Sequence, residues 1–167
     1  SMPYTLFRLS FTAGLHIGAD SGGPSLEETQ MVIRSDTLFS ALFQEAVGRG
    51  AEATLLSSVQ DRSLLFSDAL PFGLRGLYLP RPILSGGNSS IIMESTQAKA
   101  YRKLRYLPLD SLLRYLEGWA GDPLPVSELL EDFGLTELRD RTAIRGLDEA
   151  MPYRIALFRF REGCGLY

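Results

Sequence analysis

The residues with the clearest chemical potential lie in one short run between positions 99 and 106. This run holds four cations within seven residues, together with two tyrosines: Lys99, Tyr101, Arg102, Lys103, Arg105 and Tyr106. Ammonium and guanidinium groups bind phosphates, and tyrosine rings stack on unpaired bases, so the composition indicates a contact with single-stranded RNA. The alternative is a solvated charged face, which is the usual role of a short basic run.

A second group of cations, Arg139, Arg141 and Arg145, shares a polar segment with Asp140 and Gly146. We expect this segment to be a loop. Arginines on a loop either close on nucleic acid or keep the loop solvated, and the sequence leaves both readings open.

The chain contains a single histidine, His16. Its imidazole titrates near neutral pH, so it could act as a general base in RNA cleavage. Such cleavage normally needs a second acid–base group, and none is assigned to His16. The other reading is a partly buried structural histidine at the end of a strand, and we predict no catalytic residue.

The segment from Arg34 to Thr37 is predicted to start a helix. Ser35 is expected to cap it by accepting a hydrogen bond from the N–H of Thr37 or Leu38. A helix N-terminus also attracts phosphate, but the carboxylate of Asp36 repels it, which favours capping. Arg34, just before the cap, is the better phosphate partner.

The overall composition excludes several classes of protein. A net charge of −3 and a pI near 5.2 argue against a generally basic nucleic-acid binder, although they permit a local basic groove. Cys164 is the only cysteine, so we expect no disulfide framework, no zinc site built from this chain alone and a reducing cytoplasm. No signal sequence, membrane span, phosphate-binding glycine loop or nucleophile elbow is present, and we predict no cofactor.

Apolar residues recur at strand or helix spacing along the chain. The spacing predicts extended segments at 3–12, 64–66, 76–79 and 153–160. It predicts helices at 35–48, 110–118 and 126–133, with Gly48 or Gly50 ending the first and Asp110 capping the second. Residues 71–73 are expected to turn and residues 84–98 to be mobile. This order is typical of an α+β domain with one antiparallel sheet and helices on one face.

Several segments, taken in order, resemble one known family. They are Leu15-His16-Ile17-Gly18, Ile33-Arg34-Ser35-Asp36-Thr37-Leu38-Phe39-Ser40-Ala41-Leu42, Pro71-Phe72, Leu79-Pro80-Arg81-Pro82-Ile83, Arg102-Lys103-Leu104-Arg105-Tyr106-Leu107-Pro108-Leu109, Asp140-Arg141-Thr142 and Gly165-Leu166-Tyr167. Together they resemble the RAMP subunit of type III-A (Csm-type) CRISPR effector complexes that holds the 5′ handle of the guide RNA. That subunit is the fourth Csm subunit, related to the Cas-five group.

The resemblance implies a ferredoxin-like (RRM-related) α+β fold with an inserted thumb. It places residues 1–167 in an N-terminal RAMP domain, with the core at 3–83 and 151–167 and the thumb region at 84–150. Members of the family continue past Gly165-Leu166-Tyr167 into more strands. We therefore expect a truncated form or a proteolytic fragment whose open sheet edge invites self-association.

The resemblance also implies a non-catalytic RNA-binding subunit of the prokaryotic cytoplasm, acting in antiviral defence. Such a subunit binds the 5′ handle of crRNA and bridges the backbone RAMP subunits to the large polymerase-like subunit. The residues then expected near RNA are His16, Gly18, Arg34, Ser35, Lys99, Tyr101, Arg102, Lys103, Arg105, Arg141 and Arg145. Two alternatives stay open: a RAMP endoribonuclease that uses His16, and a structural module whose basic run meets an acidic protein partner.

Overall fold

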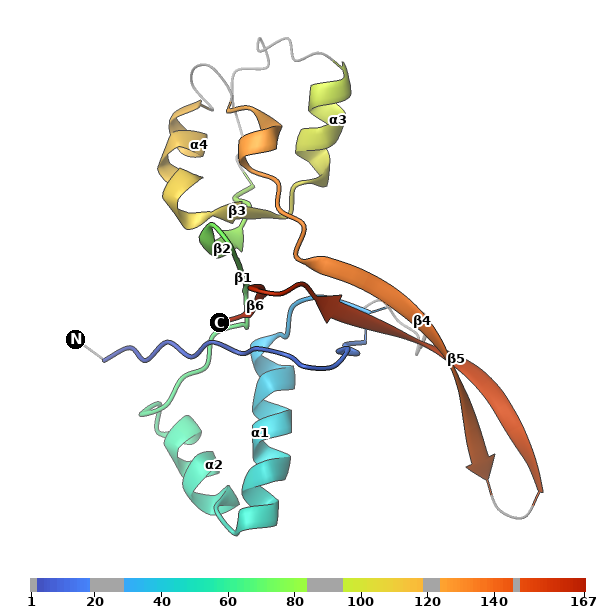
Figure 1. Cartoon of the computed structure of the whole chain (residues 1–167). Helices are drawn as coiled ribbons and strands as arrows, with labels where there is room; N and C mark the ends of the chain where they lie inside the picture. The colour runs from blue at the N-terminus through green and yellow to red at the C-terminus, as the bar shows by residue number, and fades with distance from the viewer. Residues whose placement is uncertain (1–2, 19–28, 84–94, 119–123, 146–147) are drawn as a thin grey trace. The chain divides into compact units, whose positions relative to one another are not determined.

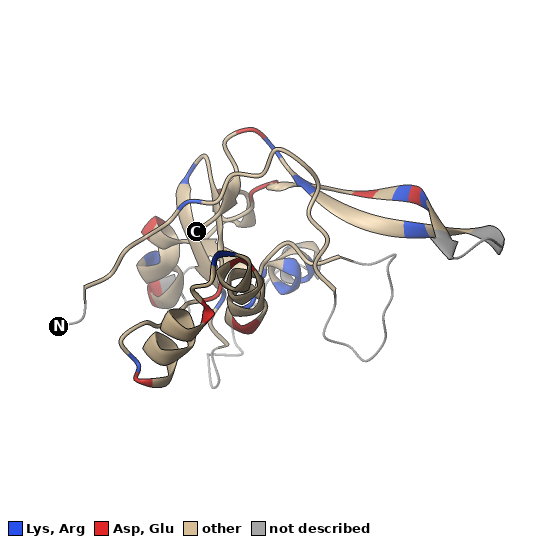
Figure 2. Ribbon diagram, turned by 90° about the horizontal axis from the view of Figure 1, so that it is seen from below, with Lys and Arg blue, Asp and Glu red and all other residues tan. Residues whose placement is uncertain are grey.

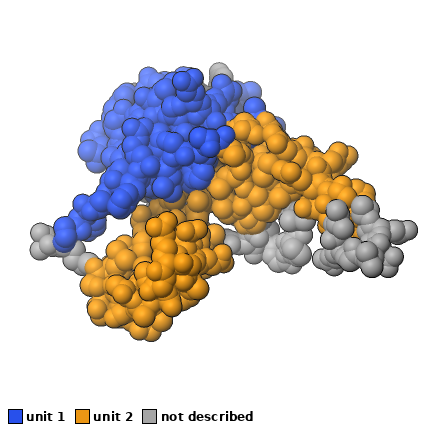
Figure 3. Space-filling view, turned by 60° about the horizontal axis from the view of Figure 1, so that its bottom comes forward, with its two compact units in different colours: residues 1–12, 70–135, 160–167 blue, residues 13–69, 136–159 orange. Residues whose placement is uncertain are grey.

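The computed structural model describes residues 3–18, 29–83, 95–118, 124–145 and 148–167. The chain divides into two compact units (Figure 3). Unit 1 comprises Ser1–Thr12, Leu70–Leu135 and Phe160–Tyr167, and unit 2 comprises Ala13–Ala69 and Thr136–Arg159. Both helices and strands are present, which confirms the α+β class. The strands form a four-stranded sheet and a separate two-stranded sheet, so the prediction of one sheet was wrong.

Unit 1 is built on the four-stranded sheet, whose strands lie in the order β3-β2-β1-β6. The strands are β1 (Pro71–Gly73), β2 (Gly76–Pro80), β3 (Tyr106–Pro108) and β6 (Gly165–Leu166). All neighbours are antiparallel, with Phe72 opposite Leu77 and Leu79 opposite Leu107. The predicted turn at 71–73 is therefore wrong, because the chain reverses after Gly73 and Gly76 adopts the positive φ of 99° that this reversal requires.

Helices of unit 1 gather beyond β3 (Figure 1). They are α3 (Ser95–Lys103), α4 (Leu112–Gly118) and the 3-10 turns η1 (Leu109–Ser111) and η2 (Val126–Glu128). These segments share one core made of Leu104, Leu107, Tyr115, Leu124, Val126 and Leu129. The predicted helix ending near Gly118 is confirmed, although Asp110 lies inside η1 and accepts a hydrogen bond from Ser111 Oγ. The predicted helix at 126–133 is reduced to η2. Helix α3 begins at Ser95 and so includes residues 95–98 of the segment predicted to be mobile. Residues 84–94 lie outside the described residues.

The predicted strand at 3–12 is wrong except at one position. Leu9 pairs with Leu166, with N–O distances of 2.7 and 3.1 Å, and the guanidinium of Arg8 lies 4.1 Å from the Phe72 ring centre. β6 is only two residues long, so it offers this segment a single pairing position. The side chains before it stay in solvent, with Tyr4 98% and Phe7 70% exposed.

Unit 2 contains the helices α1 (Ser35–Arg49) and α2 (Glu52–Gln60). The prediction of α1 is confirmed, and Gly50 ends it in the left-handed conformation, with a φ of 68°. The predicted capping by Ser35 is wrong, because Arg34 occupies the cap position and the Ser35 N–H donates to Asp68 Oδ1 at 2.8 Å. Helix α2 was not predicted, and residues 64–66 form no strand.

The two-stranded sheet is an antiparallel hairpin of β4 (Gly134–Arg145) and β5 (Asp148–Phe160), most of which belongs to unit 2 (Figure 1). The predicted strand at 153–160 is confirmed within β5. The predicted loop at 139–146 is wrong for residues 139–145, which belong to β4; Gly146 lies outside the described residues. Among the described helices none is long and apolar enough to cross a membrane.

Candidate nucleic-acid interface

The three cations Lys99, Arg102 and Lys103 lie on one face of α3. Their spacing of three and four residues places them side by side on a helix, and all three are exposed. The opposite face carries Ala100 and Tyr101, which pack against the core of unit 1 together with Leu104 just after the helix. We call the three cations, with the exposed Arg105 that follows the helix, the α3 basic face.

No side chain of the α3 basic face pairs with a carboxylate in the part of the chain that the structure describes. Other exposed arginines do pair, such as Arg49 with Glu45 and Arg114 with Glu128. Both lysines of the sequence belong to this face. The backbone at Arg105 is tied to the neighbouring segment, because its carbonyl oxygen accepts a hydrogen bond of 2.8 Å from the N–H of Arg81.

The side chain of Tyr101 takes part in the packing of unit 1. Its ring is half-buried against the core, and its hydroxyl donates to the carbonyl oxygen of Leu124. Burial raises the pKa of this hydroxyl above its ordinary value. Tyr106 lies in β3 opposite Pro80 and is also half-buried. The tyrosines that the sequence placed among the cations are therefore part of the packing of this unit.

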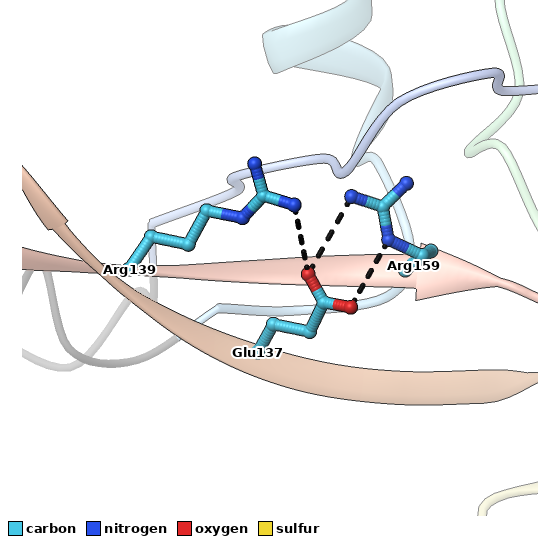
Figure 4. Close-up of polar contacts among 3 residues, drawn as sticks. All are labelled: Glu137, Arg139 and Arg159. Carbon is cyan, nitrogen blue, oxygen red and sulfur yellow. Dashed lines mark hydrogen bonds and ion pairs between the residues drawn. The ribbon is translucent and has the colours of Figure 1, made fainter.

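Unit 2 carries charges of both signs along its hairpin, as the alternating colours in Figure 2 show. Arg159 donates to both oxygens of Glu137, from Nε at 3.2 Å and from Nη2 at 3.5 Å. Arg139 donates to the same carboxylate at 3.3 Å (Figure 4). These contacts, led by the hydrogen bond from Arg159, hold the pKa of Glu137 below its usual range. Farther along, Arg154 pairs with Asp140 at 3.1 Å.

Arg141 follows Glu137 and Arg139 at alternate positions of β4, so the three side chains share one face of the hairpin. Arg141 is exposed and forms no ion pair among the described residues. The side chain of Arg145 lies outside the described part of the structure. The cross-strand partners Asp140, Arg154 and Arg159 were not identified as a group from the sequence, although the alternating charges around Arg139 were a usable signal.

His16 has a structural contact in unit 2. Its Nδ1 lies 2.8 Å from the carbonyl oxygen of Ala156, which requires that Nδ1 carry the proton and donate it. No hydrogen bond among the described residues joins the ring to an acidic side chain. Gly18 is exposed, and a Cβ atom at this position would meet no atom within 4 Å.

The start of α1 is already occupied by carboxylates. Asp68 accepts from the Ser35 N–H, and Asp36 Oδ1 accepts from the Thr37 N–H at 2.7 Å. Two negative charges at this end take up the donors that a phosphate would use, and they repel it. Arg34 is exposed beside them.

The predicted site residues thus fall into two sets. Lys99, Tyr101, Arg102, Lys103 and Arg105 belong to unit 1, whereas His16, Gly18, Arg34, Ser35 and Arg141 belong to unit 2. Within the described residues no group of three or more His, Cys, Asp or Glu side chains is arranged to hold a metal ion.

Comparison with models of known protein families finds no match. Curated relatives do exist: "CRISPR system Cms protein Csm4" from two strains of Mycobacterium tuberculosis is 32% identical over 163 residues. The protein of the same name from Streptococcus thermophilus is 26% identical over 172 residues. These alignments cover 97–99% of the present chain and 51–52% of the relatives, so the chain spans about half their length.

Proposed function

Because this chain is similar to Csm4 proteins over nearly its whole length, as its motifs predicted, we propose that it acts as a Csm4-type subunit of a type III-A CRISPR complex in antiviral defence. In this proposal the subunit binds the 5′ handle of crRNA without cleaving it. It bridges the backbone RAMP subunits to the large polymerase-like subunit, and its fold is a ferredoxin-like RAMP fold with a thumb.

The observation that carries the RNA-binding part is the α3 basic face. Its cations are exposed and unpaired among the described residues, in a chain whose net charge is −3. A net-acidic protein gains little from diffuse attraction to RNA and must bind it through a local patch. The contact between His16 Nδ1 and Ala156 orients the imidazole ring without deciding its role, so the non-catalytic part depends on the cleavage test below.

The test is the salt dependence of handle-RNA binding, measured by fluorescence anisotropy. Four substitutions to Gln at Lys99, Arg102, Lys103 and Arg105 remove the basic face while keeping good helix formers. Each phosphate contact on a single strand contributes about −0.7 to the slope of log affinity against log salt. If two to four of the side chains touch phosphates, the slope should flatten by about 1.5 to 3.

The matched control removes the same charge elsewhere, by substitution to Gln at Arg49, Arg62, Arg114 and Arg154. It should keep the wild-type slope, and the RNA recovered after each titration should be intact. Equal slopes for wild type and the basic-face variant would refute RNA binding at α3, and wild-type cleavage that His16→Ala abolishes would refute the non-catalytic assignment.

A further inference from the structure

We propose that the α3 basic face recognises a single-stranded nucleic acid only through its phosphates and reads none of its bases. The inference rests on the proposed function and narrows it, since it names the chemical group that this surface binds. The ligand class is a flexible polyphosphate strand, with no preference for sequence and none for ribose over deoxyribose at this contact.

The first step of the argument is the division of α3 into two faces. At about 100° per residue, Lys99, Arg102 and Lys103 fall on one side and Tyr101 on the other. Tyr101 is the only aromatic residue of the helix, and the residues beside it toward the core are Ala100 and Leu104. A strand lying on the cations therefore meets no ring from this helix.

The second step is that Tyr101 cannot turn outward at low cost. Its ring packs against the core of unit 1, and its hydroxyl is bonded to Leu124. Moving the ring to a base would expose apolar surface and leave a carbonyl oxygen without its partner. Stacking of a base on Tyr101, the only aromatic ring of α3, is thus unavailable at this face.

The third step concerns the donors themselves. Specific base contacts depend on planar side chains that reach base edges in fixed geometry, whereas a lysine ammonium is a point charge on a flexible stem. Lys99 and Lys103 frame the face at a spacing of four residues, and Arg102 lies between them. The two lysines can follow a backbone whatever bases it carries. In this proposal the planar guanidinium groups of Arg102 and Arg105 act as bidentate phosphate ligands.

Lysine footprinting tests this on the wild-type chain, because both lysines of the sequence lie in the face. Acetylation of Lys99 and Lys103 is measured by mass spectrometry with and without a ligand. The ligands are oligo(U), oligo(A), oligo(dT) and an abasic oligodeoxynucleotide of equal length. An Arg49→Lys variant supplies a reference amine on α1, which should acetylate equally throughout.

We expect the four strands to protect both lysines at concentrations that agree within about threefold, because the phosphate contribution does not depend on sequence. A stacked base would change affinity by about fivefold to more than a hundredfold, so failure of the abasic strand would overturn the inference. Protection by polyglutamate at the same concentration as by the abasic strand would overturn it too, in favour of an acidic protein partner.

The two proposals fail in different ways. Handle RNA that binds the protein but leaves both lysines reactive would overturn the phosphate contact at α3 while RNA binding elsewhere survives. If no RNA binds at all, the proposed function fails as well, and anisotropy with handle RNA reports that directly.

Discussion

At the residue scale, Tyr101 shows how one side chain can be assigned to packing rather than to recognition. Replacing it with Phe keeps the ring and removes only the donor to Leu124. The free energy of unfolding should fall by about 0.5–1.5 kcal/mol, the usual contribution of one hydrogen bond in a protein. Urea denaturation followed by circular dichroism measures this loss.

The matched control is Tyr4→Phe, since the Tyr4 side chain is 98% exposed. It should leave the free energy of unfolding within about 0.5 kcal/mol of wild type, as surface changes usually do. If Tyr101→Phe changes the free energy of unfolding as little as Tyr4→Phe does, the hydrogen bond to Leu124 does not stabilise unit 1. The assignment of Tyr101 to packing then loses its support.

At the element scale, the β4–β5 hairpin depends on the ion pairs made by Glu137. A carboxylate whose pKa is lowered in the folded state adds stability above its ordinary pKa, which is about 4.3 for Glu, and loses it as pH falls through the folded value. Glu137→Gln should therefore speed amide hydrogen exchange in β4 and β5 at neutral pH. The difference from wild type should shrink as pH falls through the lowered pKa of Glu137, because protonation removes the charge of the carboxylate.

Glu117→Gln on α4 is the control for the loss of one exposed carboxylate, and it should leave exchange in the hairpin unchanged. A difference in exchange that does not shrink as the pH is lowered into the acid range would show that the substitution does not act through the charge of Glu137.

The elements also show what the sequence could predict. Helix α1 was predictable because Leu38, Phe39 and Leu42 recur at helical spacing and Gly50 supplies a left-handed end. Strand β4 was not, because its charged residues leave no apolar face and its ion pairs reach to residues such as Arg159, 22 positions away. The alternation of apolar and polar residues at 3–12 predicted a strand. A strand needs a partner strand, however, and β6 pairs with this segment only through Leu9 and Leu166.

In the candidate site, too, local features could be predicted from the sequence and contacts between distant residues could not. The cations of α3 were evident from sequence because clustering of charge is a local property. The role of Tyr101 was not, because its separation from those cations depends on the helix, and its bond to Leu124 spans 23 positions. Capping by Asp68 was missed for the same reason, since it reaches Ser35 from 33 positions along the chain.

At the scale of the whole molecule, groups whose pKa is raised by burial gather in unit 1. Burial raises the pKa values of Tyr78, Tyr101 and Tyr167 and of the Cys164 thiol, because it disfavours their charged forms. For a raised pKa, the added stability is complete below the unfolded-state value and is lost as pH rises through the folded one. Those unfolded-state values are about 8.5 for Cys and about 10 for Tyr.

The protein should therefore keep its stability up to about pH 8 and lose it progressively above that, most steeply beyond about pH 10. Urea denaturation at pH 7, 9, 10 and 11 would give the midpoints, and absorbance at 295 nm would show tyrosinate appearing together with unfolding. Tyr167→Phe removes one titrating group, whose hydroxyl donates to the Tyr78 carbonyl oxygen at 2.7 Å, so it should lower stability at neutral pH but flatten the alkaline decline. The exposed-site variant Tyr4→Phe should follow the wild-type curve. Midpoints that stay constant to pH 11 would mean that these side chains ionise without leaving unit 1, and that the core described here is open to water.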